Sequence, residues 1–218
     1  MTIRLTLLCA PPADTVFGDA PPSECELRGA GAAVASLPAH APAMRSPSSG
    51  SALTAAALGL TAAAEPALRD LDRGTWRGRT VADIAAADPY GYSAWLTDPD
   101  AAPHGGETVR ELCRRIAHWL GALPPDTGRA LAIAEPAVVR ALLLHAWSVP
   151  VRAFWTLRVP PLHPVSLTWR DGVWSAQPTA TSCARGPGRP PAPPLTVLTA
   201  PRRTVSDRGP RLRGDRVA

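Results

Sequence analysis

Blocks of apolar and polar positions along this chain predict an ordered series of strands and helices. Short apolar runs over residues 3–8 and 129–134 predict two buried strands. The clearest helix is predicted over residues 107–123, where apolar side chains recur at i, i+3, i+4 and i+7 and charged side chains take the other face. Further helices are predicted over residues 26–37, 51–60, 80–87, 90–96 and 137–147.

The remaining pattern predicts how these elements combine. Residues 43–45 can form a short strand, and residues 165–169 and 172–175 predict an antiparallel hairpin around Arg170-Asp171. Strands that alternate with helices favour an α/β fold, here a three-layer sandwich with a mainly parallel sheet and helices on both faces. In such folds a pocket is expected at the carboxyl ends of the strands.

Composition divides the chain into two parts. Residues 1–178 carry the periodic pattern and are predicted to form one domain, whereas residues 179–218 are rich in Pro and Arg and are predicted to be a disordered tail. Residues 181–218 hold eight Arg and two Asp, a net charge of +6, while residues 1–180 hold 15 Arg and 16 acidic residues, a net charge of −1. The basic charge therefore belongs to the tail, and the domain carries no strong nucleic-acid signal.

Cysteine spacing and hydropathy narrow the class of protein further. The four cysteines, Cys9, Cys25, Cys113 and Cys183, are scattered without a CxxC or Cys/His ligand spacing, which predicts neither a disulfide framework nor a metal site. Reduced thiols are typical of a cytoplasmic protein. No apolar run approaches the roughly 20 residues needed to span a membrane. No cofactor is predicted, and the pattern does not indicate an oligomeric state.

Short motifs follow one another in an order that carries functional information. They are Ser-Pro at 46–47, Thr-Ala at 54–55, Leu-Arg-Asp at 68–70, Gly-Thr-Trp-Arg-Gly at 74–78 and Val-Val-Arg-Ala at 138–141. In this order, over roughly residues 3 to 176, the chain resembles the histidine phosphatase (phosphoglycerate mutase-like) superfamily, as a divergent member. The resemblance implies a histidine phosphatase-like α/β fold and a small phosphorylated or other small-molecule ligand.

The resemblance also assigns the catalytic positions. In such a family a histidine attacks phosphorus, arginines and a second histidine bind the phosphoryl oxygens, and a carboxylic acid protonates the leaving group. Cys9-Ala10-Pro11 stands where the family has Arg-His-Gly, so Ala10 replaces the nucleophile. Gly50 replaces an arginine, and Glu135 replaces the second histidine. Asp70 keeps the position of the acid, so four of five core positions are changed.

Other groups could take over part of the lost chemistry. Cys9 could be a replacement nucleophile, but it lacks a following arginine loop, so a buried, inert thiol is favoured. His104 and Glu107 belong to a loop that borders the pocket in such folds; His104 could be a surrogate nucleophile, although a solvated loop histidine is favoured. Asp70 and Asp72 would share a face of a strand, yet further metal ligands are missing.

These residues support one functional hypothesis and two alternatives. The leading hypothesis is a degenerate member of the superfamily, without the phosphohistidine nucleophile because Ala10 stands in its place. The first alternative is a phosphomonoester hydrolase with a non-standard site. The second is a non-catalytic interaction or ligand-binding protein. Whether the chain is an enzyme is therefore left open by its sequence.

Overall fold

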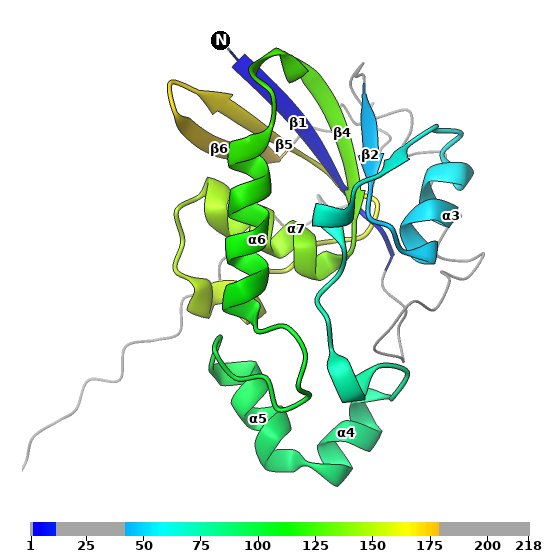
Figure 1. Cartoon of the computed structure of the whole chain (residues 1–218), viewed down its shortest axis with the longest axis vertical. Helices are drawn as coiled ribbons and strands as arrows, with labels where there is room; N and C mark the ends of the chain where they lie inside the picture. The colour runs from blue at the N-terminus through cyan, green and yellow to red at the C-terminus, as the bar shows by residue number, and fades with distance from the viewer. Residues whose placement is uncertain (1, 12–41, 179–218) are drawn as a thin grey trace, which may run out of the picture.

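A six-stranded sheet forms the centre of the computed structural model, which describes residues 2–11 and 42–178 (Figure 1). The strand order is β3-β2-β4-β1-β5-β6. The strands are β1 (Thr2–Cys9), β2 (Ala43–Arg45), β3 (Ala63–Ala64), β4 (Arg129–Ala134), β5 (Pro164–Arg170) and β6 (Val173–Pro178). Strands β1 to β4 are mutually parallel, and β5 and β6 add an antiparallel edge. The predicted α/β fold with a mainly parallel core is confirmed.

The two predicted buried strands lie side by side at the centre of the sheet. Their register pairs Leu5 with Ala130 and Cys9 with Ala134, so β1 and β4 end together. Such apolar runs fit strands that are covered on both faces. As a result, Ala10 and Glu135, the residues that follow the two strands, emerge at the same edge.

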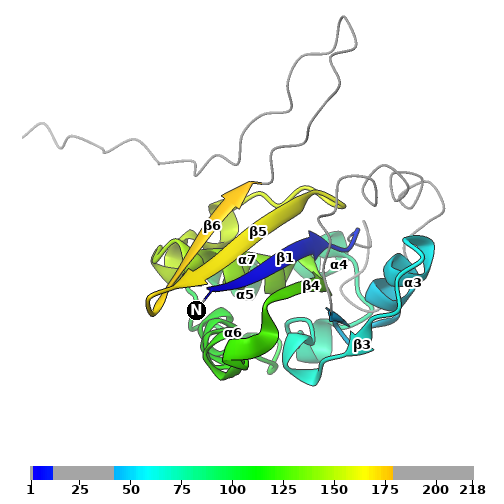
Figure 2. The same ribbon diagram turned by 90° about the horizontal axis from the view of Figure 1, so that it is seen from above.

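Helices cover both faces of the sheet. Successive side chains of β1 alternate between two hydrophobic clusters: Leu7 packs in the cluster that includes α6 (Val109–Ala122) and α7 (Pro136–Ala146), and Leu8 packs with α3 (Ser49–Ala57). Figure 2 shows α3 apart from α6 and α7. The predicted three-layer arrangement is therefore confirmed.

Local sequence signals explain where the elements begin and turn. Helix α6 begins two residues later than predicted, because Thr108 is its N-cap and forms a capping box with Glu111. The β5–β6 hairpin turns at Asp171-Gly172, one residue later than predicted. Both residues have positive φ, 53° and 84°, as a type I′ turn requires.

A smaller lobe projects from the carboxyl end of the sheet. It contains α4 (Val81–Ala87) and α5 (Pro89–Thr97), close to their predicted positions, and lies below the sheet in Figure 1. Short 3-10 helices complete the fold: η1 (Pro66–Leu68), η2 (Gly74–Trp76), η3 (Pro125–Thr127) and η4 (Val151–Thr156). The predicted helix over residues 26–37 and the predicted tail over residues 179–218 lie outside the described residues. In the part of the chain that is described, no helix is long and apolar enough to cross a membrane.

Candidate active site at the carboxyl ends of the strands

The nucleophile position of the predicted site is occupied by a buried methyl group. Ala10 is only 1% exposed, and it packs with Leu8, Ala55 and Leu58 between the sheet and α3. Its backbone N–H donates to the carbonyl of Ala134 at 2.9 Å, which continues the β1–β4 ladder by one residue. The side chain at position 10 is therefore part of the core and carries no reactive group.

Glu135 lies opposite Ala10 and is held by the start of α3. Its Oε1 accepts hydrogen bonds from the Ser48 hydroxyl and from the Ser51 hydroxyl, the latter at 2.8 Å. Ser48 is also the N-cap of α3, because its Oγ accepts the Ser51 backbone N–H at 3.0 Å. A carboxyl group thus sits among buried serine hydroxyls at the end of β4.

The surroundings of Glu135 favour its neutral form. Burial raises the pKa of its carboxyl group, and the negative charge of Asp70 raises this pKa further. Hydrogen bonds from Ser48, Ser46 and Ser51 act in the opposite direction. The second oxygen, Oε2, is buried and has no hydrogen-bond partner among the described residues.

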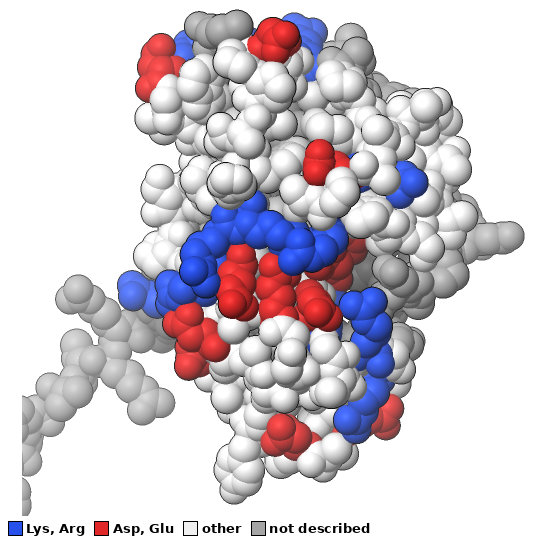
Figure 3. Space-filling view, viewed as in Figure 1, with Lys and Arg blue, Asp and Glu red and all other residues white. Residues whose placement is uncertain are grey.

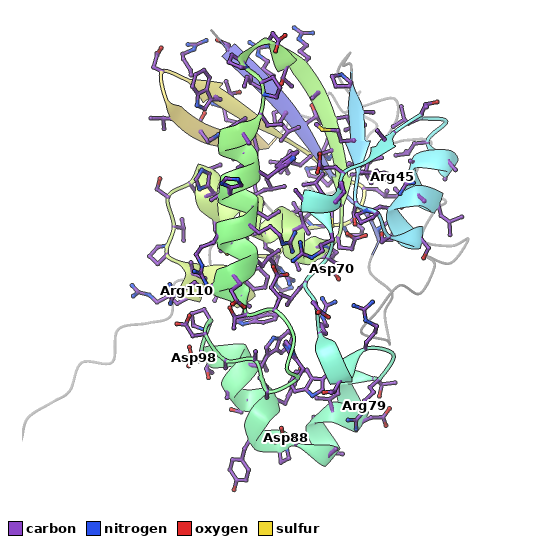
Figure 4. The ribbon with its side chains drawn as sticks, in the orientation of Figure 1. Arg45, Asp70, Arg79, Asp88, Asp98 and Arg110 are labelled. Carbon is purple, nitrogen blue, oxygen red and sulfur yellow. The ribbon has the colours of Figure 1, made fainter. Side chains whose placement is uncertain are left out.

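Asp70 reaches the site from the irregular segment between η1 and η2. Its Oδ2 accepts a hydrogen bond from Arg73 Nη1 at 2.7 Å, and Figure 4 shows it below the ends of the strands. The expectation that Asp70 and Asp72 share one face of a strand is wrong. Asp72 instead accepts the Gly74 backbone N–H at 3.0 Å and pairs with Arg77 at 3.2 Å. Within residues 2–11 and 42–178 no group of three His, Cys, Asp or Glu side chains could hold a metal ion.

Arg140 brings a second cation to the site, and the sequence named it only as part of a motif. It lies on α7 beyond Glu135, donates from Nε to the Leu157 carbonyl at 2.9 Å and stacks on the Phe154 ring at 5.6 Å. Burial lowers the pKa of Arg140, whereas the charge of Asp70 raises it. The site therefore combines two carboxyl groups with two guanidinium groups.

Gly50, which the motif order assigns to the position of a family arginine, has no side chain. Gly50 lies in the first turn of α3, where its carbonyl accepts the Thr54 hydroxyl at 2.8 Å. Arg45, at the end of β2, donates to the Ser46 carbonyl at 2.9 Å (Figure 4). Arg28 lies outside the described residues.

Cys9 and His104 are both buried. Cys9 is buried at the end of β1, as expected, and burial raises the pKa of its thiol far above the ordinary range. The expectation that His104 is a solvated loop residue is wrong, because it is 1% exposed. Its ring lies 5.0 Å from the ring of Trp76 and 6.3 Å from that of Trp95, and Nδ1 accepts the Gly106 N–H at 3.0 Å. Burial and Arg73 lower the pKa of His104.

Glu107 is engaged by two arginines. Arg115 of α6 binds both of its oxygens at 2.8 Å, and Arg69 approaches Oε1 at 3.4 Å. Figure 3 shows basic and acidic side chains meeting in one belt across this face. Glu107 therefore holds the loop before α6 against the rest of the domain. Its carboxylate is already paired with arginine side chains and does not need a ligand as its partner.

Comparison with known proteins places this arrangement in a family. Residues 26–180 match the histidine phosphatase superfamily (branch 1), a match that begins after β1 and Ala10. The chain is 31% identical over 149 residues to glucosyl-3-phosphoglycerate phosphatase of Mycobacterium tuberculosis. The alignment covers 57% of this chain and 66% of that protein, so this chain spans slightly less than two thirds of the relative's length.

Solved structures share the fold at lower identity. A putative alpha-ribazole-5'-P phosphatase from Escherichia coli superposes with a TM-score of 0.72 at 20% identity, over 81% of this chain and 95% of that chain. Mycobacterial glucosyl-3-phosphoglycerate phosphatase superposes with a TM-score of 0.66 at 23% identity, over 83% of this chain and 100% of that chain.

Proposed function

The chain belongs to the histidine phosphatase superfamily (branch 1), and we propose that it is a degenerate member, which lacks phosphohistidine chemistry and binds a small molecule in the ancestral pocket. One observation carries the proposal: a buried methyl group and a largely buried carboxyl group, those of Ala10 and Glu135, occupy the two strand ends to which the motif order assigns the family's nucleophile and its second histidine. An alanine has no lone pair with which to form a phosphorylated intermediate.

Electrostatics support the same proposal. A phosphate about 4 Å from an ionised Glu135 would meet a repulsion of about 4 kcal/mol for each negative charge at an effective dielectric constant of 20. The arginine that would offset this repulsion is replaced by Gly50. Arg73 already pairs with Asp70, and Arg140 is bound to a backbone carbonyl. The ligand would therefore be small and would carry less negative charge than a phosphomonoester, although the relatives are named as phosphatases.

A phosphomonoester hydrolase with a non-standard site is the second candidate. Asp70 still occupies the position of the acid. Arg73 forms an ion pair with it, and the charge of Arg140 interacts with the charges of both residues. We also infer a cytoplasmic location, which the reduced thiols of Cys9 and Cys113 support. The division at residue 178 and the disordered state of residues 179–218 are further proposals, supported by composition.

Turnover of a panel of phosphomonoesters by the full-length protein tests the proposal. We expect wild type and Asp70→Asn to be equally inactive, and we expect orthovanadate to leave the melting temperature of both unchanged. Turnover by wild type that Asp70→Asn abolishes would establish the second candidate in its place. Stabilisation by vanadate without turnover would show that the pocket still binds oxyanions, contrary to the proposed polarity.

A further inference from the structure

Among residues 2–11 and 42–178, serine hydroxyls are the nucleophiles that remain to be considered at the strand ends. Cys9 is buried with a raised pKa, and His104 lies within an aromatic cluster. Four serines lie between the end of β2 and the first turn of α3: Ser46, Ser48, Ser49 and Ser51. Ser49 is exposed, Ser46 and Ser51 are fully buried, and Ser48 keeps 8% of its surface exposed. Of Ser48 and Ser51, which both donate to Glu135, Ser48 is therefore the one more open to a ligand.

Ser48 has the hydrogen-bond geometry of an activated hydroxyl. Its Oγ donates to Glu135 Oε1, so its proton already points at a carboxyl group. The Ser51 N–H donates to the same Oγ at 3.0 Å, which fixes the rotamer and leaves one lone pair uncommitted. A hydroxyl becomes a useful nucleophile when an adjacent base lies within hydrogen-bond reach, as Glu135 does here.

Glu135 is fixed in place and is a stronger base than an exposed carboxylate. The Ser51 hydroxyl donates to Oε1 at 2.8 Å, which orients the carboxyl group toward α3. Its raised pKa, caused by burial and by Asp70, moves its proton affinity toward the neutral range in which general bases work best. Asp70 in turn is positioned by Arg73.

We propose that Ser48 is a catalytic nucleophile and Glu135 its general base, in a site that hydrolyses neutral carboxylic esters. This activity goes beyond the proposed loss of phosphatase chemistry and does not depend on a phosphate ligand. Neutral esters fit because they avoid repulsion by Glu135 and Asp70. The N-terminal end of α3, with Ser48 as N-cap, supplies positive potential for an oxyanion.

The reaction balances with these groups and water alone. Ser48 Oγ attacks the ester carbonyl carbon while its proton moves to Glu135, giving a tetrahedral oxyanion. The oxyanion collapses to an acyl-serine, and the departing alkoxide takes the proton from Glu135 and leaves as an alcohol. Glu135 then accepts a proton from water, whose oxygen attacks the acyl carbon. Collapse of this second adduct returns the proton to Ser48 Oγ and releases the carboxylic acid.

Covalent labelling of the full-length protein with a fluorophosphonate tests the assignment. The serine oxygen displaces fluoride from phosphorus, so the adduct marks an activated hydroxyl. We expect one adduct, located by peptide mass analysis at Ser48, and hydrolysis of p-nitrophenyl acetate. Ser48→Gly, which an N-cap tolerates well, should lose both. Ser93→Ala, which removes an exposed hydroxyl on α5, should match wild type.

Glu135→Gln separates a catalytic base from a structural hydrogen-bond partner. Glutamine can still accept the serine hydrogen bonds, so at about pH 4.5 the melting temperature should stay close to that of wild type. The labelling rate should fall by about 100-fold or more, the usual contribution of a general base. Absence of an adduct, an adduct elsewhere, or equal labelling of Glu135→Gln would overturn the proposal. Phosphomonoester turnover tests the loss of phosphatase chemistry separately.

Discussion

Among single residues, Glu135 sets the charge of the site. Its carboxyl group is buried beside Asp70, and three serine side chains offset part of the cost of its ionised form. Because the pKa of Glu135 is raised by folding, the folded chain binds its proton more tightly than the unfolded chain does. Glu135 therefore stabilises the fold fully below its ordinary pKa of 4.5, and this contribution is lost as the pH rises through the folded pKa.

Glu135→Gln should remove this pH dependence. The free energy of unfolding of Glu135→Gln, relative to wild type, should increase between about pH 4.5 and about pH 8. Each tenfold difference in proton affinity between folded and unfolded chains corresponds to about 1.4 kcal/mol. Guanidinium unfolding at the two pH values measures the difference.

Asp83→Asn provides a control of opposite sign. Hydrogen bonds from the Thr80 hydroxyl and backbone N–H lower the pKa of Asp83, so its ionised form stabilises the fold above the ordinary pKa. Relative to wild type, Asp83→Asn should therefore lose stability as the pH rises to the ordinary aspartate pKa of 3.8, and the difference should stay nearly constant between about pH 5 and about pH 8. If Glu135→Gln behaves in the same way, the raised pKa of Glu135 is contradicted.

Between elements, two close contacts hold the loops that carry Asp70 and His104. Gly74 has φ +43°, and a Cβ at this position would lie 2.1 Å from the His104 carbonyl oxygen. The same carbonyl accepts the Thr75 N–H at 2.9 Å, so the two loops cannot separate without losing this bond. Glu107 joins the second loop to α6 through Arg115.

Gly74→Ala should destabilise the protein by about 3 kcal/mol or more, because backbone atoms must move to admit the methyl group. Gly121→Ala is the matched control, since a methyl group there meets no described atom within 4 Å. In the helix α6, that change should stabilise the protein by about 0.5–1 kcal/mol. Equal effects of the two variants in thermal unfolding would contradict the close approach at Gly74.

Glu107→Gln should cost about 2–3 kcal/mol, because it leaves the mostly buried Arg115 guanidinium without its bidentate partner. The Asp100–Arg110 pair has similar chemistry but lies largely exposed, so Asp100→Asn should leave the unfolding midpoint unchanged. Denaturant unfolding of both variants measures the contrast. If Glu107→Gln leaves the unfolding midpoint unchanged, the ion pairs of Glu107 with Arg69 and Arg115 do not hold the loop.

Periodicity predicted the elements well, because local patterns decide them. The apolar run of β4 and the stripe of α6 each identify one element without reference to the rest of the chain. Motif order likewise assigned positions 10, 50, 70 and 135 to the predicted site, and this assignment stays a prediction. The sequence could not reveal that Ser48 and Ser51 bind Glu135, because 87 and 84 residues separate these pairs. Nor could loop composition reveal that His104 packs against Trp76 and Trp95.

At the scale of the whole molecule, the last strand of the described fold, β6, ends at residue 178. The antiparallel pair β5–β6 completes the sheet, and Trp147 Nε1 donates to the Ala176 carbonyl at 3.1 Å, which ties β6 to α7. A chain that ends at residue 178 should therefore keep the melting temperature of the full chain within about 2 °C. It should also elute earlier from a cation-exchange column, because residues 181–218 carry a net charge of +6. A drop of about 10 °C would instead assign the last 40 residues a part in folding.

The packing around Ala10 and Glu135 determines how the proposed site could be redesigned. A histidine at position 10 would have to displace Ala55 or Leu58, which pack with the Ala10 methyl group. A histidine at position 135 would leave the hydroxyls of Ser48 and Ser51 without the acceptor that they share. The phosphohistidine chemistry that we propose to be missing could therefore not be installed by one substitution. It would require coordinated changes on β1, α3 and the end of β4.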